Sequence, residues 1–305
     1  MQTSIITCCL FLLAQYTVGQ ERINLWEQNN MPNTKGVPLQ DSIASERIYQ
    51  VAEPRIQAFF TSSQENKRAA VLIIPGGGYA RLAYEISGYQ LAKWFNTMGI
   101  HAFVLEHRMP QSPDVITSHL APLQDAQRAI RLIKHNAATW DIDVHKIGVM
   151  GSSAGAHLAA TLSTWNQDVS SLGDTLDDND FKPAFQILIS PVIDLGNFAH
   201  KGSRENLLGT QPSEELVKKF SLQHQVDAQT PPAFIVHAFD DNAVRANNSL
   251  LYYERLLSNG IPSALHIFPG GKHAIALRNN PGSTSQWVDL CEEWLIEQEI
   301  ISRFK

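Results

Sequence analysis

The sequence has little cysteine and no long hydrophobic run. Of its 3 cysteines, Cys8 and Cys9 stand near the amino terminus, which leaves Cys291 alone in the remainder. One cysteine cannot form an internal disulfide, so we expect no disulfide scaffold and a buried Cys291 in the last helix. The apolar segment 5–13 is shorter than the stretch of about 20 apolar residues that crosses a bilayer. We therefore predict no membrane span.

Basic charge is also scarce. The formal net charge is −6, from 24 lysines and arginines against 30 aspartates and glutamates. Nucleic-acid binding would call for a basic stripe, and the chain has none. It also lacks low-complexity tracts, internal repeats, a dinucleotide-binding fingerprint and any cluster at metal-ligand spacing. The sequence therefore predicts no nucleic-acid partner, no cofactor and no metal.

The amino terminus is uncharged. Residues 1–20 combine the apolar segment with small residues near Val18-Gly19, a pattern typical of a secretory signal peptide. We predict that residues 1–19 are a signal peptide and that the mature protein is secreted or periplasmic. A lipid anchor on Cys8 or Cys9 is disfavoured, because both precede most of the apolar segment. Residues 20–45, broken by prolines and glycine, predict an irregular N-terminal arm, and 46–305 a single catalytic domain.

Strand and helix patterns alternate from residue 69 to the carboxyl terminus. Buried strands are expected at 69–74, 100–106, 147–150, 185–190, 233–239 and 263–268, with helical patterns between most of them. Apolar and polar residues alternate over 55–61 as in an outer strand, and the pattern over 195–230 indicates a partly helical insertion. This order predicts an α/β fold with a mainly parallel central sheet and helices on both faces. In such sheets ligands bind at the carboxyl ends of the strands.

The stretch Gly151-Ser152-Ser153-Ala154-Gly155 lies between a predicted strand and a predicted helix. It matches the G-x-S-x-G nucleophile elbow, in which a sharp turn raises the central serine above the strand ends. Glycines suit the flanking positions because side chains there would collide with the neighbouring strand or helix. We predict Ser153 as the nucleophile. Ser152 is the weaker candidate because it is not central in the pattern.

A serine nucleophile needs a base and a group that orients the base. His273 follows the last predicted strand in a glycine-rich loop that can bend back towards the elbow. Asp241 follows the strand before it, and the D-x-x-V spacing favours it over Asp240, which we expect in a turn or cap. Asp194 is the outside alternative, one strand earlier. The sequence thus orders the triad as Ser153, Asp241 and His273.

The other histidines have structural interpretations. His157 lies on the elbow helix and is expected to point away from the corner. His101, His237 and His266 fall within strands as sheet or core residues. Surface positions are expected for His135, His145, His200 and His224.

An oxyanion hole requires N–H groups aimed at the developing negative charge. The N–H of Ala154, just past the nucleophile, is one candidate. Gly76-Gly77-Gly78 follows an upstream strand and lets the backbone approach a substrate, so we predict Gly77 and Gly78 as the others. No lysine and serine follow these glycines as in a P-loop, which disfavours phosphate binding.

Several ordered motifs resemble those of a known group. They are Leu25-Trp26, Pro75–Tyr79, Leu105–Pro110, Asp125–Ala129, the elbow through Ala159, and Pro231–Asp241 with Asn248-Ser249. Together, over about 24–280, they resemble bacterial α/β-hydrolases of the carbohydrate esterase type, which include acetyl-xylan esterases and bifunctional feruloyl and acetyl esterases. The resemblance implies the α/β-hydrolase fold, the same triad, and secreted or periplasmic enzymes that remove acyl groups from plant polysaccharides. It also implies a structural ion pair from Asp125 and Arg128.

The sequence departs from that group at glycine positions, which carry Ala156, Lys272, Ala274 and Ala276. Side chains there predict a more restricted histidine loop and pocket wall, with a shifted acyl preference. The predicted function is a carboxylic ester hydrolase acting on acylated carbohydrate, with acetyl the preferred acyl group. Feruloyl esterase, serine peptidase or amidase activity on the same triad, and a non-catalytic binding protein remain alternatives. The peptidase hypothesis is weakened because we expect no large amino-terminal domain that would restrict access to the site.

Overall fold

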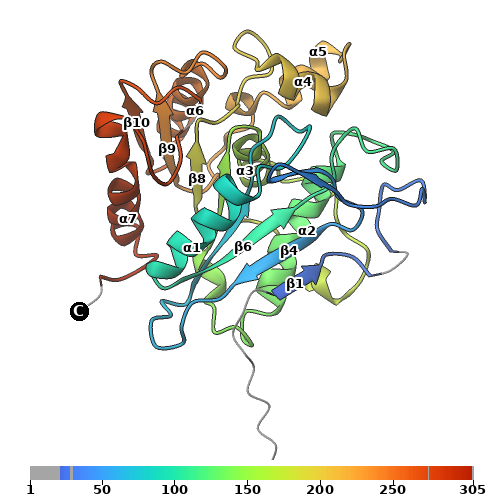
Figure 1. The fold of residues 1–305 in the computed structure, drawn as a ribbon, viewed down its shortest axis with the longest axis horizontal. Coiled ribbons are helices and arrows are strands. Elements are labelled where there is room, and N and C mark those ends of the chain that lie inside the picture. The colour runs from blue at the N-terminus through green and yellow to red at the C-terminus, as the bar shows by residue number, and fades with distance from the viewer. Residues whose placement is uncertain (1–20, 28–29, 274, 304–305) are drawn as a thin grey trace, which may run out of the picture.

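The computed structural model describes residues 21–27, 30–273 and 275–303, so the predicted signal peptide lies outside the described residues. Its centre is an eight-stranded sheet with the order β1-β4-β6-β5-β7-β8-β9-β10 (Figure 1). Neighbours from β6 to β10 are parallel, whereas β4 is antiparallel to both β1 and β6. The strands are β1 (Glu21–Asn24), β4 (Arg55–Phe59), β5 (Ala69–Ile74), β6 (Ile100–Glu106), β7 (Ile147–Ser152), β8 (Gln186–Ile189), β9 (Ala233–Ala238) and β10 (Ala264–Phe268). The predicted α/β fold with a mainly parallel sheet is confirmed.

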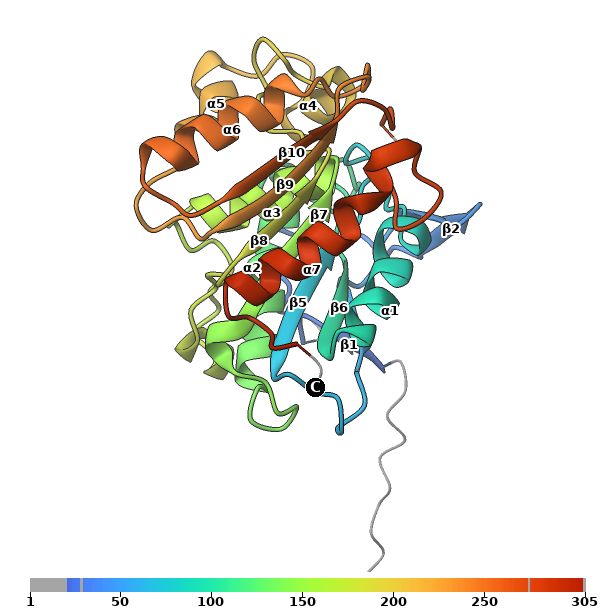
Figure 2. The same cartoon turned by 90° about the vertical axis from the view of Figure 1, so that its left-hand side faces the viewer.

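Helices cover both faces of this sheet (Figure 2). On one face lie α1 (Gln90–Thr97) and α7 (Trp287–Glu297), and on the other α2 (Ala121–His135), α3 (Ala154–Thr164) and α6 (Asn247–Ser258). The central strand β5 serves both faces because successive side chains point to opposite sides. Val71 and Ile73 pack with α1 and α7, and Leu72 and Ile74 pack with α2 and α3.

Shorter elements complete the fold. A hairpin consists of β2 (Ser42–Ala44) and β3 (Arg47–Gln50), and the predicted insertion contains α4 (Lys201–Leu208) and α5 (Glu214–Lys219). Single helical turns are η1 (Glu85–Tyr89), η2 (Val144–Lys146), η3 (Thr175–Asp178), η4 (Leu222–His224) and η5 (Gly282–Gln286). Cys291 is fully buried on α7, as expected. None of the helices in the described part of the chain is long and apolar enough to cross a membrane.

Two expectations about the amino-terminal region are wrong. Residues 20–45 are not irregular throughout, because β1 adds to the sheet and β2 begins the hairpin. The strand at 55–59 is not an outer strand, since β1 pairs along it and all five of its residues are buried. β1 escapes detection because its one apolar residue, Ile23, gives no alternating pattern. β1 is stabilised by hydrogen bonds to the edge of β4 and not by burial of its side chains.

A buried ion pair ties the amino-terminal region to the sheet and α2. Arg108, just after β6, donates through Nη2 to Asp125 Oδ1 at 2.8 Å, and Trp26 Nε1 donates to the same oxygen at 2.9 Å. The Arg108 Nη1 also donates to the carbonyl of Pro32 at 2.6 Å. Asp125 and Arg128 therefore do not pair with each other. Arg128 instead pairs with Asp174 in the loop after α3.

Removing one partner of this pair should be costly. The side chains of Arg108 and Asp125 are 2% and 0% exposed, so Asp125→Ala would leave an uncompensated guanidinium in the interior. We expect the free energy of unfolding in urea to fall by about 3–5 kcal/mol. The control is Glu293→Gln, which breaks the exposed pair with Arg303 and should barely move the unfolding midpoint. Equal losses in the two variants would contradict the assignment.

Candidate active site

The predicted elbow is present at the carboxyl end of β7. Ser153 joins β7 to α3 with φ 56° and ψ −120°, a backbone conformation that strains any residue with a side chain. The backbone around Ser153 is packed so closely that the turn cannot widen to relieve this strain. A methyl group added at Gly155 would lie 2.2 Å from the carbonyl oxygen of Ile74, and one at Gly151 would lie 2.4 Å from that of Gly155. The turn therefore requires glycine on both sides of the serine, as predicted.

The structure brings the three predicted triad residues together. His273 Nε2 lies 2.8 Å from Ser153 Oγ, and His273 Nδ1 lies 2.7 Å from Asp241 Oδ2. The His273 side chain is 28% exposed, whereas that of Asp241 is fully buried. One imidazole can therefore contact both the serine hydroxyl and the carboxylate while one edge faces the pocket.

Asp241 is surrounded by hydrogen-bond donors. Its Oδ1 accepts from the N–H groups of Ala243 and Val244 at 3.0 and 2.9 Å, and its Oδ2 lies 3.3 Å from His237 Nε2. Burial acts to raise the pKa of Asp241, but hydrogen bonds from His237, His273 and Val244 outweigh it and hold the pKa well below its usual value. The carboxylate is thus ionised and fixed in place. His237 is buried, as expected, and lies beside the acid, a position that no sequence pattern indicates.

Asp240 fixes the histidine loop. It lies in the turn after β9, as expected, and its Oδ1 accepts the N–H of Lys272 at 2.7 Å, so it also joins the end of β9 to the loop after β10. Lys272 has φ 51°, in the left-handed region that favours glycine. This conformation agrees with the glycine expected there from the family resemblance. Ala274 lies outside the described residues, and Ala276 lines the pocket.

The glycine loop after β5 leaves two N–H groups free. The N–H of Gly76 donates to Ser87 Oγ at 3.1 Å. The three glycine carbonyls accept from elsewhere: from the N–H groups of Ala83 and Ala80, and from Asn206 Nδ2 at 2.8 Å. Among the described residues, the N–H groups of Gly77 and Gly78 meet no acceptor, and both glycines line the pocket beside Ser153. The N–H of Ala154 has no acceptor within α3 because it stands at the start of the helix.

A cavity of about 550 Å³ opens over Ser153 and His273, within the range of small-molecule sites. The insertion contributes His200, Gly202 and Asn206 to its wall. His200, expected at the surface, is half-buried in this wall. Its Nδ1 accepts the N–H of Ser203 at 3.2 Å, so the neutral ring carries its proton on Nε2. Burial, and then the charge of His273, lower the pKa of His200. No sequence motif marks His200 or Asn206.

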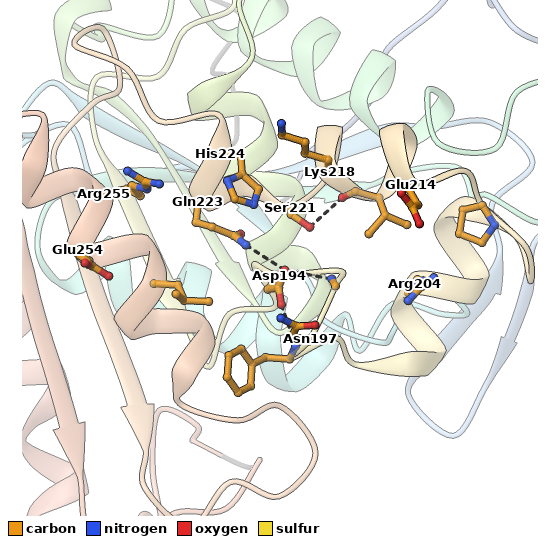
Figure 3. Close-up of a pocket in the computed structure, with 15 residues that line it drawn as sticks. Asp194, Asn197, Arg204, Glu214, Lys218, Ser221, Gln223, His224, Glu254 and Arg255 are labelled. Carbon is orange, nitrogen blue, oxygen red and sulfur yellow. Dashed lines mark hydrogen bonds between the residues drawn. The ribbon is translucent and has the colours of Figure 1, made fainter.

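The alternative acid Asp194 belongs to a different cavity. Figure 3 shows it with Gln223 and Ser221 between the loop after β8, η4 and α6, in a space of about 560 Å³. Its Oδ1 accepts from Gln223 Nε2 at 2.9 Å and its Oδ2 from the N–H of Phe198 at 2.8 Å. Asp194 therefore shapes its own loop. The only carboxylate that contacts His273 within the described residues is that of Asp241.

His157 points away from the elbow, as expected. It is fully buried, with Nδ1 2.8 Å from Tyr79 Oη and Nε2 2.9 Å from the carbonyl oxygen of Phe220. His101, on β6, is buried, while His135, His145 and His224 are exposed, in agreement with the sequence analysis. Within the described residues no group of three or more histidine, cysteine, aspartate or glutamate side chains could hold a metal ion.

Comparison with known proteins places this geometry in a family. The BD-FAE family model matches residues 56–256. The chain belongs to the BD-FAE family. The resemblance to carbohydrate esterases of the α/β-hydrolase fold is thereby confirmed.

Similar proteins share most of this chain. A crystal structure of an acetyl ester-xyloside bifunctional hydrolase from Caldicellulosiruptor lactoaceticus is 34% identical, with a TM-score of 0.81, over 92% of this chain and 97% of that one. Endo-1,4-beta-xylanase B of Butyrivibrio fibrisolvens is 35% identical over 80% of this chain, and an acetylxylan esterase of Xylanibacter ruminicola is 34% identical over 67%. The chain spans only 38% and 40% of these two curated relatives. Membership of the BD-FAE family agrees with the predicted class, a carboxylic ester hydrolase.

The environment of His157 predicts a pH-dependent stability. Burial lowers its pKa from 6.5 to about 4 in the folded protein. Below pH 6.5 the unfolded chain therefore binds a proton that the folded chain excludes, so the free energy of unfolding should fall as the pH drops towards 4. A difference of this size amounts to about 3 kcal/mol. We expect His157→Gln to flatten the dependence between pH 7 and 4.5 in urea unfolding. His145→Gln, at an exposed site, is the control, and a slope unchanged by His157→Gln would refute the assignment.

Proposed function

We propose that this chain is a serine esterase that removes acyl groups, with acetyl preferred, from plant polysaccharide or oligosaccharide. The observation that carries the proposal is the hydrogen-bonded row Asp241–His273–Ser153, which ends in a pocket beside two unpaired glycine N–H groups. The named acetyl esterase relatives supply the carbohydrate substrate class. No second function has a comparable observation in its favour.

Acylation would begin at the serine. Ser153 Oγ attacks the ester carbonyl carbon while His273 Nε2 accepts its proton, and the buried carboxylate of Asp241 stabilises the resulting imidazolium. Negative charge develops on the carbonyl oxygen, and the N–H groups of Gly77, Gly78 and Ala154 would stabilise it by donating hydrogen bonds to that oxygen. One such donor typically lowers the barrier by about 3 kcal/mol.

Deacylation would use the same groups. His273 first passes its proton to the departing sugar hydroxyl, which breaks the ester C–O bond and leaves an acyl group on Ser153. It then takes a proton from a water molecule, whose oxygen attacks the acyl carbon. When the bond between the acyl carbon and Ser153 Oγ breaks, His273 returns this proton to Oγ and the carboxylic acid leaves. The pocket is open and its N–H donors come from the backbone, so the mechanism needs only the groups described.

The proposal includes the location and extent of the enzyme. We propose that the enzyme works outside the cytoplasm, where polysaccharides are found, in accord with the predicted signal peptide at 1–19. The catalytic unit would extend from residue 21 to the carboxyl-terminal helix, because β1 forms part of its sheet.

The triad assignment predicts distinct losses in three variants. Ser153→Ala should abolish release of p-nitrophenol from p-nitrophenyl acetate. Asp241→Asn should lower kcat about ten-thousandfold, because the imidazole would lose its anionic partner. Asp194→Asn, the matched change at the alternative acid, should keep kcat within a few-fold of the unaltered protein. Equal rates of p-nitrophenol release by Ser153→Ala and by the unaltered protein would remove the basis of the mechanism and leave the binding-protein alternative.

The substrate preference can be measured directly. We expect p-nitrophenyl acetate to be cleaved faster than the butyrate and ferulate esters. The reason is the restricted wall formed by Ile275, Ala276 and Ile189 beside the nucleophile. Fastest cleavage of the ferulate ester would favour the feruloyl esterase alternative. Cleavage of anilides at a comparable rate would favour an amidase.

A further inference from the structure

Among the described residues that line the catalytic pocket, two are arginines and none is an aspartate or a glutamate. Its ionisable lining residues are Arg47, Arg81, His200 and His273. Asp241 lies behind His273 and does not line the cavity. This local balance is opposite to that of the whole chain, whose formal net charge is −6. The positive wall is therefore a property of this site and not of the surface in general.

The segments that carry the two arginines are paired by backbone hydrogen bonds, and both arginine side chains lie on the same face of this pair. Ile48 and Leu82 exchange hydrogen bonds of 3.0 and 2.8 Å, and each side chain is buried with 1% exposure. Neighbouring residues of an extended chain point to the opposite face. Arg47 and Arg81, one residue before each, therefore project away from this small core and border the pocket.

Neither guanidinium is neutralised by the protein. Arg47 makes one side-chain hydrogen bond, to the carbonyl of Glu46, and Arg81 makes none in the described part of the chain. Neither takes part in an ion pair there. Glu46 and Glu85 lie near Tyr84, outside the pocket. Arg47 is half-buried and Arg81 is exposed, and an anion bound between or beside them would offset their mutual repulsion.

We propose that Arg47 and Arg81 form a subsite for a carboxylate on the substrate, so that the preferred substrate is an acylated oligosaccharide that also carries a uronic acid. The inference rests on the proposed esterase function, because it names the substrate class of the same pocket. The guanidinium groups present N–H donors that match a carboxylate and stay charged at every physiological pH. The subsite would bind a sugar next to the one whose ester is cleaved.

Binding can be tested separately from hydrolysis. In the Ser153→Ala protein, calorimetry would compare an acetylated xylo-oligosaccharide bearing a uronic acid with the same molecule after reduction of its carboxyl group. We expect the charged form to bind roughly tenfold more tightly at low salt, the lower end for a charge-assisted hydrogen bond. The preference should shrink as sodium chloride screens the charges.

Arginine variants identify the groups responsible. In that background, Arg81→Gln and Arg47→Gln should each lower the ratio of the two affinities severalfold, whereas Arg81→Lys should keep most of it. Arg204→Gln is the matched control, because Arg204 lies on α4 but lines the other cavity (Figure 3), and it should leave the ratio unchanged. In the active enzyme, the ratio of kcat/KM for the two substrates should follow the same order.

The outcomes separate this proposal from the esterase proposal. Equal affinity for charged and reduced oligosaccharides, or equal loss for both in the arginine variants, would overturn the carboxylate subsite. Preference for p-nitrophenyl succinate over the acetate, without any preference between the oligosaccharides, would place the carboxylate on the acyl group and overturn the assignment to a sugar. A retained binding preference with no release of acetate or p-nitrophenol by the unaltered protein would support the subsite and refute the esterase.

Discussion

The contact between the first turn of α3 and the end of β5 is the constraint on which the site depends. At Gly155 the helix backbone passes so close to the carbonyls of Ile74 and Pro75 that no side chain fits. This contact holds Ser153 in a strained conformation, which costs about 1–3 kcal/mol and survives only because the surrounding core fixes it. The same strand end leads directly into the glycine loop. One packing contact thus sets the relative positions of Ser153, the proposed nucleophile, and of the N–H groups proposed to stabilise the transition state.

The buried carboxylate supplies the second fixed point. Burying Asp241 without partners would favour its neutral form, but two backbone N–H groups and two imidazoles surround it. The two backbone bonds hold Oδ1, which leaves Oδ2 oriented towards His273. His237 is itself held by Ser249 Oγ and the carbonyl of Val244, so it is a rigid support. The direction of the His273 imidazole is therefore determined by β9 and its following turn, not by the exposed loop that carries it.

The sequence predicted those parts of the site that depend on short-range patterns. The elbow, the glycine loop and the two loops bearing Asp241 and His273 each follow a recognisable strand, and parallel strands bring their carboxyl ends to one edge. His200 and Asn206 could not be predicted, because they come from an insertion without a motif and reach the pocket only through tertiary contacts. The bond from Asn206 to Gly78 joins positions far apart in the chain. The same limit applies to β1, where edge pairing and not apolar periodicity specifies the strand.

Adjacent aspartates divide two tasks that a single residue could not perform. Asp241 orients the His273 ring. Asp240 accepts a hydrogen bond from the backbone N–H of Lys272, the residue before His273, and so holds the loop in place. Lys272 has a positive φ, which costs an ordinary residue roughly 1–2 kcal/mol relative to its preferred conformation. The hydrogen bond from its N–H to Asp240 offsets part of that cost. A glycine would relieve the strain but add conformational freedom to the unfolded loop. The lysine and the aspartate together therefore favour a fixed loop, and with it a fixed distance between imidazole and serine.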